Sequence, residues 1–165
     1  MITPIEFFKE QVKIWNESQH CGNCWDFSAP LSESGFEEQQ LKEGKECCYQ
    51  LIITDYATDE SNEYNPANYT RRKICNHRFV MYIVKASDIG TNTYDEIDNH
   101  PIEESKWETI IKPLFECFGC DAMIDYCQIV GYPIQIPQWR VEKVINKTSN
   151  NYDGIKITGT FREIS

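Results

Sequence analysis

The residues whose types and spacing could do chemistry are the cysteines, of which the 165-residue chain has eight. Four of them form two C-x-x-C pairs, Cys21-Gly-Asn-Cys24 and Cys117-Phe-Gly-Cys120. A C-x-x-C loop can supply two of the four ligands that a structural zinc ion takes. The first pair is the stronger candidate, because the glycine and asparagine between its thiols favour a turn. Cys21 and Cys24 are therefore candidate zinc ligands.

The other cysteines are more simply interpreted as buried thiols. Cys117 and Cys120 lie among apolar residues of a predicted helix, where cysteine is typically a small core residue. The two pairs are also far apart in sequence, unlike the compact spacing of zinc ribbons and fingers. The N-terminal segment has neither the basic nor the apolar region of a secretory signal, so we expect reduced thiols. We predict no cofactor and no metal, with zinc at Cys21 and Cys24 as the alternative.

The best candidate for nucleophilic catalysis is Cys75-Asn76-His77. Cys75 and His77 fall on one face of a predicted strand, where we expect them to half face solvent. The sequence contains no phosphate-binding glycine loop, no nucleophile elbow and no H-E-x-x-H motif. We therefore predict that the protein is not an enzyme. The alternative is a small hydrolase or host-modulating enzyme, with a pocket in which Cys75 or His77 lies beside a carboxylate.

The charge of the chain excludes several classes of function. Its 16 basic and 26 acidic residues give a net charge of −10 and a pI near 4.8. Because binding to nucleic-acid phosphates depends on Lys and Arg, we expect no sequence-specific nucleic-acid partner. No apolar run approaches the roughly 20 residues that cross a bilayer, so we expect no membrane partner.

The elements that would position these residues follow from the spacing of apolar side chains. Thr3-Pro4-Ile5-Glu6 predicts a helix start, with Thr3 as the N-cap and Glu6 completing a capping box. Runs of β-branched and aromatic residues predict four strands, and Pro113 predicts a kink in a second long helix. The predicted elements are a helix ending near residue 17 or 18, strands at 48–56 and 72–85, a helix at 103–126, and strands at 133–146 and 154–164.

These elements predict a single α+β domain over residues 1–165, in the order helix-strand-strand-helix-strand-strand. Two hairpins would form a four-stranded, mainly antiparallel sheet with the helices packed on one face. Residues 19–46 would be an irregular insert, with a short helix at 35–42. Residues 57–70 are polar and contain Asn-Pro, so we predict a long exposed loop at the hairpin tip.

The surface offers candidate partner contacts. Tyr64 and Tyr69 lie in the predicted hairpin tip, and Tyr94 lies in a second acidic loop. Aromatic residues in polar loops are typical of interfaces. Lys156 and Arg162 lie on the solvated face of the last strand, opposite in sign to those loops. Opposite charges on separate surfaces suit head-to-tail assembly, which closes into a ring when the rotation allows.

Five stretches of the chain carry a resemblance to a known group of proteins: ITPIEFFKEQVKIW, CYQLIITDY, NHRFVMYIVKASD, ESKWETIIKPLFE and NNYDGIKITGTFREI. They resemble small virion proteins of tailed bacteriophages, in the tail-terminator, tail-completion or neck group. The acidic segment that leads into ESKWETIIKPL is similar to such proteins from phages of gut Bacteroides. The insert at 19–46 and the many cysteines depart from that group.

The resemblance implies a structural protein without catalytic residues. It implies a homo-oligomeric ring, hexameric or twelve-fold, that caps the tail or joins it to the head as a head–tail connector. Its partners would be other neck, tail and portal proteins of the virion, with assembly in the host bacterial cytoplasm. A zinc-stabilised adaptor or protein-interaction module is the alternative in a different class of function.

Overall fold

The computed structural model describes residues 3–86, 111–117, 134–148, 150 and 152–164. The predicted loop at 86–102, apart from Ala86, and most of the predicted helix at 103–126 lie outside these residues. Among the residues that are described, no helix is long and apolar enough to cross a membrane.

The first helix, α1 (Pro4–Ser18), begins where the sequence predicts. The Thr3 hydroxyl accepts a hydrogen bond from the Glu6 backbone N–H at 3.1 Å, and the Glu6 carboxylate accepts one from the Thr3 backbone N–H at 3.2 Å. This reciprocal pair satisfies backbone donors that a helix start otherwise leaves open. The helix ends at Ser18 and is followed by the C-cap residue Gln19, whose backbone is left-handed. The predicted capping box and helix end are confirmed.

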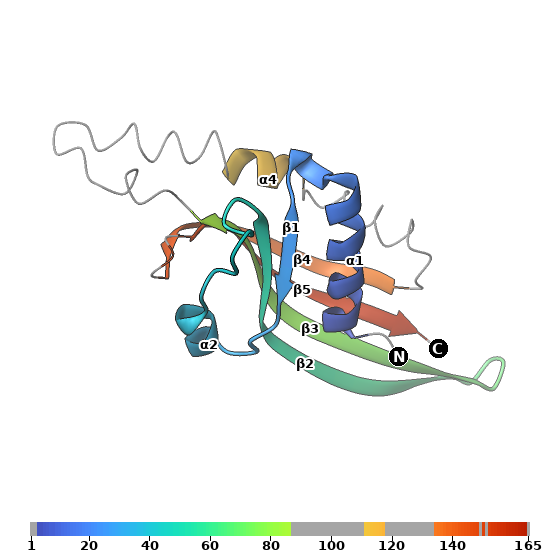
Figure 1. The fold of residues 1–165 in the computed structure, drawn as a ribbon. Helices are drawn as coiled ribbons and strands as arrows, with labels where there is room; N and C mark the ends of the chain where they lie inside the picture. Colours follow the sequence, from blue (N-terminus) through green and yellow to red (C-terminus); the bar gives the residue numbers. More distant parts are fainter. Residues whose placement is uncertain (1–2, 87–110, 118–133, 149, 151, 165) are drawn as a thin grey trace.

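The strands form one five-stranded sheet in the order β1-β2-β3-β5-β4. Both predicted hairpins are confirmed as antiparallel pairs, and β3 pairs antiparallel with β5 to join them. The predicted count of four strands is wrong by one, because β1 adds a short parallel strand beside β2 (Figure 1). The strands are β1 (Trp25–Ser28), β2 (Tyr49–Asn65), β3 (Thr70–Ala86), β4 (Ile134–Lys147) and β5 (Tyr152–Ile164). The fold is mixed α+β.

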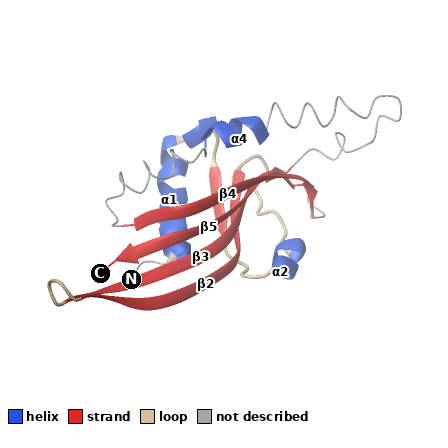
Figure 2. Ribbon diagram, turned by 180° about the vertical axis from the view of Figure 1, so that it is seen from behind, coloured by secondary structure: helices blue, strands red, loops and turns tan. Residues whose placement is uncertain are grey.

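The inner face of the sheet carries the main core. Leu51, Met81 and Ile157 are fully buried here, and they cluster with Phe8 of α1. Leu114 of α4 (Lys112–Cys117) joins the same cluster. Figures 1 and 2 show α1 lying across this face of the sheet. The burial of these side chains is the principal stabilising contribution in this part of the molecule.

The outer face carries a smaller cluster. Ile52, Tyr82 and Tyr152 alternate with the inner residues and pack against Phe36. Phe36 belongs to α2 (Glu33–Glu38), which Ser32 caps by accepting the Gly35 N–H at 2.9 Å. The region predicted as an irregular insert thus contains β1, α2 and the short turn η1 (His20–Gly22), and it contributes buried side chains to the fold.

The β2–β3 hairpin extends far beyond the other elements (Figure 1). Strand pairing continues to Asn65 and Thr70, so the prediction of a loop over 57–70 is wrong except for the turn at its end. The pairing is polar on both faces, and every residue from 57 to 73 is exposed. We call residues 57–73 the hairpin arm. A bulge between Ile53 and Asp55 precedes it.

Candidate functional site

Four cysteines form two disulfides, which corrects the expectation of reduced thiols. Cys21 is joined to Cys117, with Cα atoms 6.5 Å apart, and Cys24 to Cys48, with Cα atoms 4.7 Å apart. Both separations are within the range that disulfide geometry requires. Cys75, which is buried, and Cys47, which is exposed, are outside any disulfide. Cys120 and Cys127 lie outside the described residues.

The two cysteines considered as alternative zinc ligands, Cys21 and Cys24, are therefore divided between two bonds. Cys21 ties the turn after α1 to α4, and Cys24 ties the start of β1 to the start of β2. The structure instead brings together the first cysteines of the two C-x-x-C pairs. Repetition of the motif was the sequence signal for this contact, although the distance along the chain argued against it.

His20 lies beside the first disulfide. Its Nε2 atom is 3.2 Å from Cys117 Sγ. The ligand atoms of His20, Cys21 and Cys117 all lie within 4.8 Å of one another, and all three residues are half-buried. Sequence reasoning missed this contact, because His20 and Cys117 come from elements that are distant in the chain. We call these three residues the thiol–histidine cluster.

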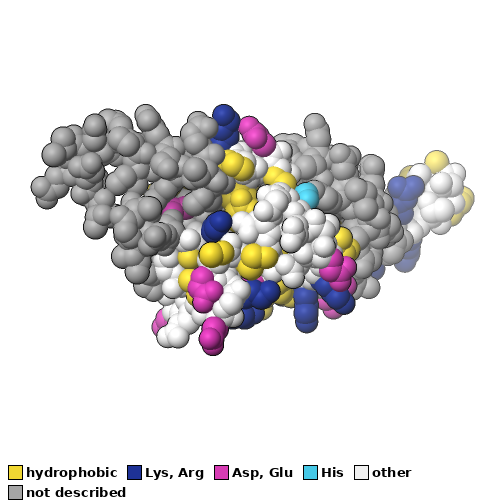
Figure 3. Space-filling view, turned by 45° about the horizontal axis from the view of Figure 1, so that its top comes forward, with side chains coloured by type: hydrophobic (Ala, Val, Ile, Leu, Met, Phe, Trp, Pro, Cys, Tyr) yellow, Lys and Arg dark blue, Asp and Glu magenta, His cyan; other side chains and the backbone are white. Residues whose placement is uncertain are grey.

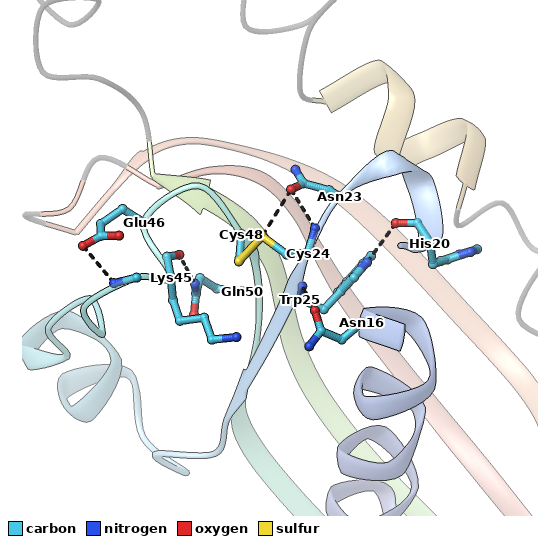
Figure 4. Close-up of a disulfide and its surroundings, with 10 residues drawn as sticks. Asn16, His20, Asn23, Cys24, Trp25, Lys45, Glu46, Cys48 and Gln50 are labelled. Atoms are coloured by element: carbon cyan, nitrogen blue, oxygen red, sulfur yellow. Dashed lines mark hydrogen bonds between the residues drawn. A yellow bond between two sulfur atoms is a disulfide. The ribbon is translucent and has the colours of Figure 1, made fainter. Parts of the chain in front are cut away.

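The turn that carries His20 and Cys21 is held from two sides. Trp25 Nε1 donates a hydrogen bond to the His20 carbonyl oxygen at 2.9 Å (Figure 4). The His20 ring stacks on Trp15, with centroids 5.2 Å apart and an interplanar angle of 22°. Burial lowers the pKa of His20 from its usual value of 6.5, which favours the neutral imidazole. Cys21 has a φ of 56°, a left-handed conformation that is uncommon for residues other than glycine.

The Cys24–Cys48 disulfide lies among hydrogen bonds that hold the strands it joins (Figure 4). The Cys24 N–H donates to Asn23 Oδ1 at 2.9 Å, and the Tyr49 N–H donates to the Cys24 carbonyl oxygen at 2.9 Å. Asn16 of α1 accepts the Trp25 N–H at 3.1 Å. These bonds anchor β1 between α1 and β2. The role of this disulfide is to fix the edge of the sheet.

Cys75 and His77, the candidate pair for nucleophilic catalysis, are not half-exposed as expected. Cys75 is 4% exposed and His77 is 1% exposed. The Cys75 thiol donates to Glu60 Oε1 at 3.7 Å, and His77 Nδ1 lies 3.0 Å from Thr58 Oγ1. Each side chain thus meets a cross-strand neighbour on β2, as the register of the hairpin requires.

The predicted aromatic contacts Tyr64 and Tyr69 lie near the end of the hairpin arm. Their exposed fractions are 53% and 82%. The Arg71 guanidinium lies 6.0 Å from the centre of the Tyr64 ring. Figure 3 shows hydrophobic and basic side chains together at this projecting end of the molecule. The third predicted contact, Tyr94, lies outside the described residues.

Lys156 and Arg162, the basic residues predicted to contact a partner, lie on the outer face of the sheet, where both are partly buried. Lys156 Nζ lies 5.7 Å from the centre of the Tyr82 ring, on the neighbouring strand. Arg162 Nε donates to Asn76 Oδ1 at 3.5 Å. Both side chains therefore have contacts within the sheet as well as access to solvent.

The outer face of the sheet is hollowed between β2, β3, β5 and β4. A concavity of about 760 Å³ is lined by residues of four neighbouring strands, namely Asp55, Ala57, Arg78, Phe79, Val80, Arg140, Thr158, Gly159 and Thr160. The cations in it have acidic partners. Arg78 forms an ion pair with Asp59, and Arg140 Nη2 lies 2.7 Å from Glu142 Oε1. The concavity is thus an open surface whose two arginines are each paired with a carboxylate, and its lining does not include Cys75 or His77.

Comparison with known proteins adds no relative: no protein-family model matches the chain, and no curated protein matches it. Function must therefore be argued from the chain's own geometry.

Proposed function

We propose that this protein is a virion structural protein of the tail-terminator or neck type, which assembles with copies of itself into a ring at the tail end or head–tail junction. The observation that carries the proposal is the hairpin arm. Its two strands pair along their whole length while every side chain from 57 to 73 stays exposed. An element that contributes so little to its own core is suited to contact a neighbouring molecule.

The edges of the arm are available for such contacts. The described pairing of β1 with β2 stops at Ile52, and that of β5 with β3 stops at Ile74. Beyond these points the described residues provide no further strand on either side of the arm. Unpaired edge N–H and C=O groups are templates for pairing with another chain. The charged side chains along the arm restrict that pairing to complementary partners.

The charges of the arm differ between its two strands. The β2 strand carries Asp59, Glu60 and Glu63, whereas the β3 strand carries Arg71, Arg72 and Lys73. Lys73 Nζ lies 3.2 Å from Glu60 Oε1, so part of this charge is paired within the arm. An acidic edge and a basic edge on one element favour head-to-tail contact between copies, which is the arrangement that closes rings. Ring symmetry of six or twelve is part of the proposal.

The disulfides are compatible with a virion that leaves its host. Thiols stay reduced during assembly in the bacterial cytoplasm, whereas the surface of a released particle is exposed to oxidising conditions. The proposal also includes the finer architecture of the resembled group, in which the second long helix lies on the same face as α1. Ile111 and Leu114, both fully buried in the main core cluster, support that placement.

Native mass spectrometry of the purified chain, alone and with virion neck and tail proteins, tests this function. We expect discrete rings, and we expect Tyr64→Ser/Tyr69→Ser to weaken assembly by about tenfold or more, as loss of exposed aromatic anchors does. Ile14→Ser is the matched control, since Ile14 is 43% exposed on α1, away from the arm. A chain that stays monomeric in every mixture and is absent from purified particles contradicts the proposal.

A second candidate is a metal-stabilised adaptor, which the thiol–histidine cluster favours. The thiol–histidine cluster lies within one chain, so it does not depend on ring assembly. A small hydrolase has less support, because the buried Cys75 and His77 lie away from the open concavity of the outer face.

A further inference from the structure

We propose that, in the reduced chain, His20, Cys21 and Cys117 bind a thiophilic divalent cation of the zinc class, so that disulfide and metal site are alternative states of the same two thiols. This inference is independent of ring assembly. The cluster is the only group of three potential ligand residues among the described parts of the chain.

The positions of the ligand atoms carry the proposal. The two sulfur atoms are already in contact, and His20 Nε2 is 3.2 Å from one of them. Ligands of a tetrahedral zinc ion lie about 2.0–2.3 Å from the metal, which places neighbouring ligand atoms about 3.3–3.8 Å apart. Once the disulfide is reduced, only small side-chain rotations are needed to reach that spacing, within the 4.8 Å that encloses the cluster.

The imidazole is oriented before any metal arrives. Its ring is held against Trp15, and the backbone carbonyl of His20 is held by Trp25. Such supporting contacts reduce the ordering that a ligand must undergo on binding. Cys21 and Cys117 also pack against the main core cluster, which limits the positions open to both sulfur atoms.

The chemistry balances with a dithiol as the reductant. The dithiol transfers two electrons and two protons to the Cys21–Cys117 bond and becomes a cyclic disulfide, leaving two free thiols. Zn²⁺ then displaces the two thiol protons and binds two thiolates and one neutral imidazole. The two thiolate charges neutralise the cation. Three protein ligands leave one position for water or a further ligand.

The second disulfide supplies a matched control. Cys24 and Cys48 form a bond of the same kind on the same part of the fold, yet no third ligand residue is grouped with them in the described structure. The proposal therefore predicts metal binding that depends on one disulfide pair and not on the other.

The test measures zinc by elemental analysis after the intact chain is reduced, incubated with zinc chloride and desalted without oxygen. We expect zinc at one ion per chain in the reduced wild type and in Cys24→Ser/Cys48→Ser. We expect no stoichiometric zinc in the oxidised wild type, in Cys21→Ser or in Cys117→Ser. His20→Gln should weaken affinity at least about tenfold, because even the loss of a supporting group has that effect.

A second measurement needs no variant and so does not depend on whether a variant folds. Bound zinc should slow alkylation of Cys21 and Cys117 in the reduced wild type, while Cys47, which is exposed and free, reacts at an unchanged rate. Peptide mass spectrometry reads each site separately. Absence of zinc from the reduced wild type, or protection that does not include Cys21 and Cys117, would overturn the proposal.

Discussion

Cys21 and Cys117 are joined by a disulfide across 96 positions of sequence. The bond connects the turn after α1 to α4, and its two sulfur atoms lie beside His20. In contrast, Cys24 and Cys48 close a shorter segment of 24 positions at the edge of the sheet. The two bonds therefore differ both in the length of chain that they close and in the chemistry around them.

Removal of the shorter disulfide should lower stability substantially. In the chain-entropy account, a cross-link that closes a segment of this length stabilises the folded state by about 3 kcal/mol. We expect Cys24→Ser/Cys48→Ser to reduce the free energy of unfolding by about that amount, measured by urea denaturation without reductant. Cys47→Ser, which removes an exposed free thiol, is the control and should stay within about 0.5 kcal/mol of wild type.

Phe36 should be the side chain of the 19–46 region on which the outer cluster depends. It is fully buried, and its ring lies 4.8 Å from that of Tyr82 and 5.7 Å from that of Tyr152. Phe36→Ala should cost about 3–5 kcal/mol in chemical denaturation, through lost burial and the resulting cavity. Ile14→Ala, at an exposed position of α1, should cost less than about 1 kcal/mol. Equal losses for both variants would contradict this role of Phe36.

Gly154 should tolerate no side chain. A methyl group there would overlap the backbone carbonyl of Ile83 and approach Val84 Cα to 2.9 Å, and neither backbone atom can move without disturbing β3. Gly154→Ala should therefore destabilise the β3–β5 pairing, and hydrogen exchange should rise at the amides of both strands. Thr158→Ala, at an exposed position of β5, provides the comparison and should leave exchange unchanged.

Alkaline pH should unfold the protein partly through Tyr82. Burial, followed by the hydrogen bond that Tyr82 donates to Glu33 at 2.9 Å, raises the pKa of Tyr82 above its usual value of 10.0. The unfolded chain loses this proton first, so stability is complete below about pH 10 and falls as the pH rises beyond it. Tyr82→Phe should reduce the slope of unfolding free energy against pH in this alkaline range.

The alkaline slope should not vanish in that variant. Burial also raises the pKa of Tyr49, and it raises that of Tyr152 to about 12. Tyr64→Phe, at an exposed position, is the control and should keep the wild-type slope. A Tyr82→Phe slope equal to that of wild type would contradict the assignment.

The elements best predicted from sequence are those whose signals are local. The capping box at Thr3 and Glu6 involves residues three apart, and both hairpins have apolar stretches that pair with near neighbours in the chain. β1 was missed because four residues in a region with many turn-forming residues carry too weak a pattern. Its pairing with β2 depends on tertiary context.

The errors in the candidate sites have related causes. Residues 57–65 are polar on both faces, so hydrophobic alternation could not distinguish a paired but solvated strand from a loop. The burial of His77 and the contact of His20 with Cys117 both depend on segments that are distant in sequence. The repeated C-x-x-C spacing was visible, but only the fold could indicate which cysteines meet.

The bulge at Thr54 changes the phase of β2. Before it, the odd-numbered Leu51 and Ile53 face inward; after it, the even-numbered Tyr56 and Thr58 take that side, opposite Phe79 and His77. One extra residue thus decides which face of the hairpin arm carries each acidic side chain of β2. Deletion of Thr54 would turn residues 57–65 over to the opposite face of the sheet without changing their order, so the length of one strand segment decides which side chains a neighbouring molecule meets.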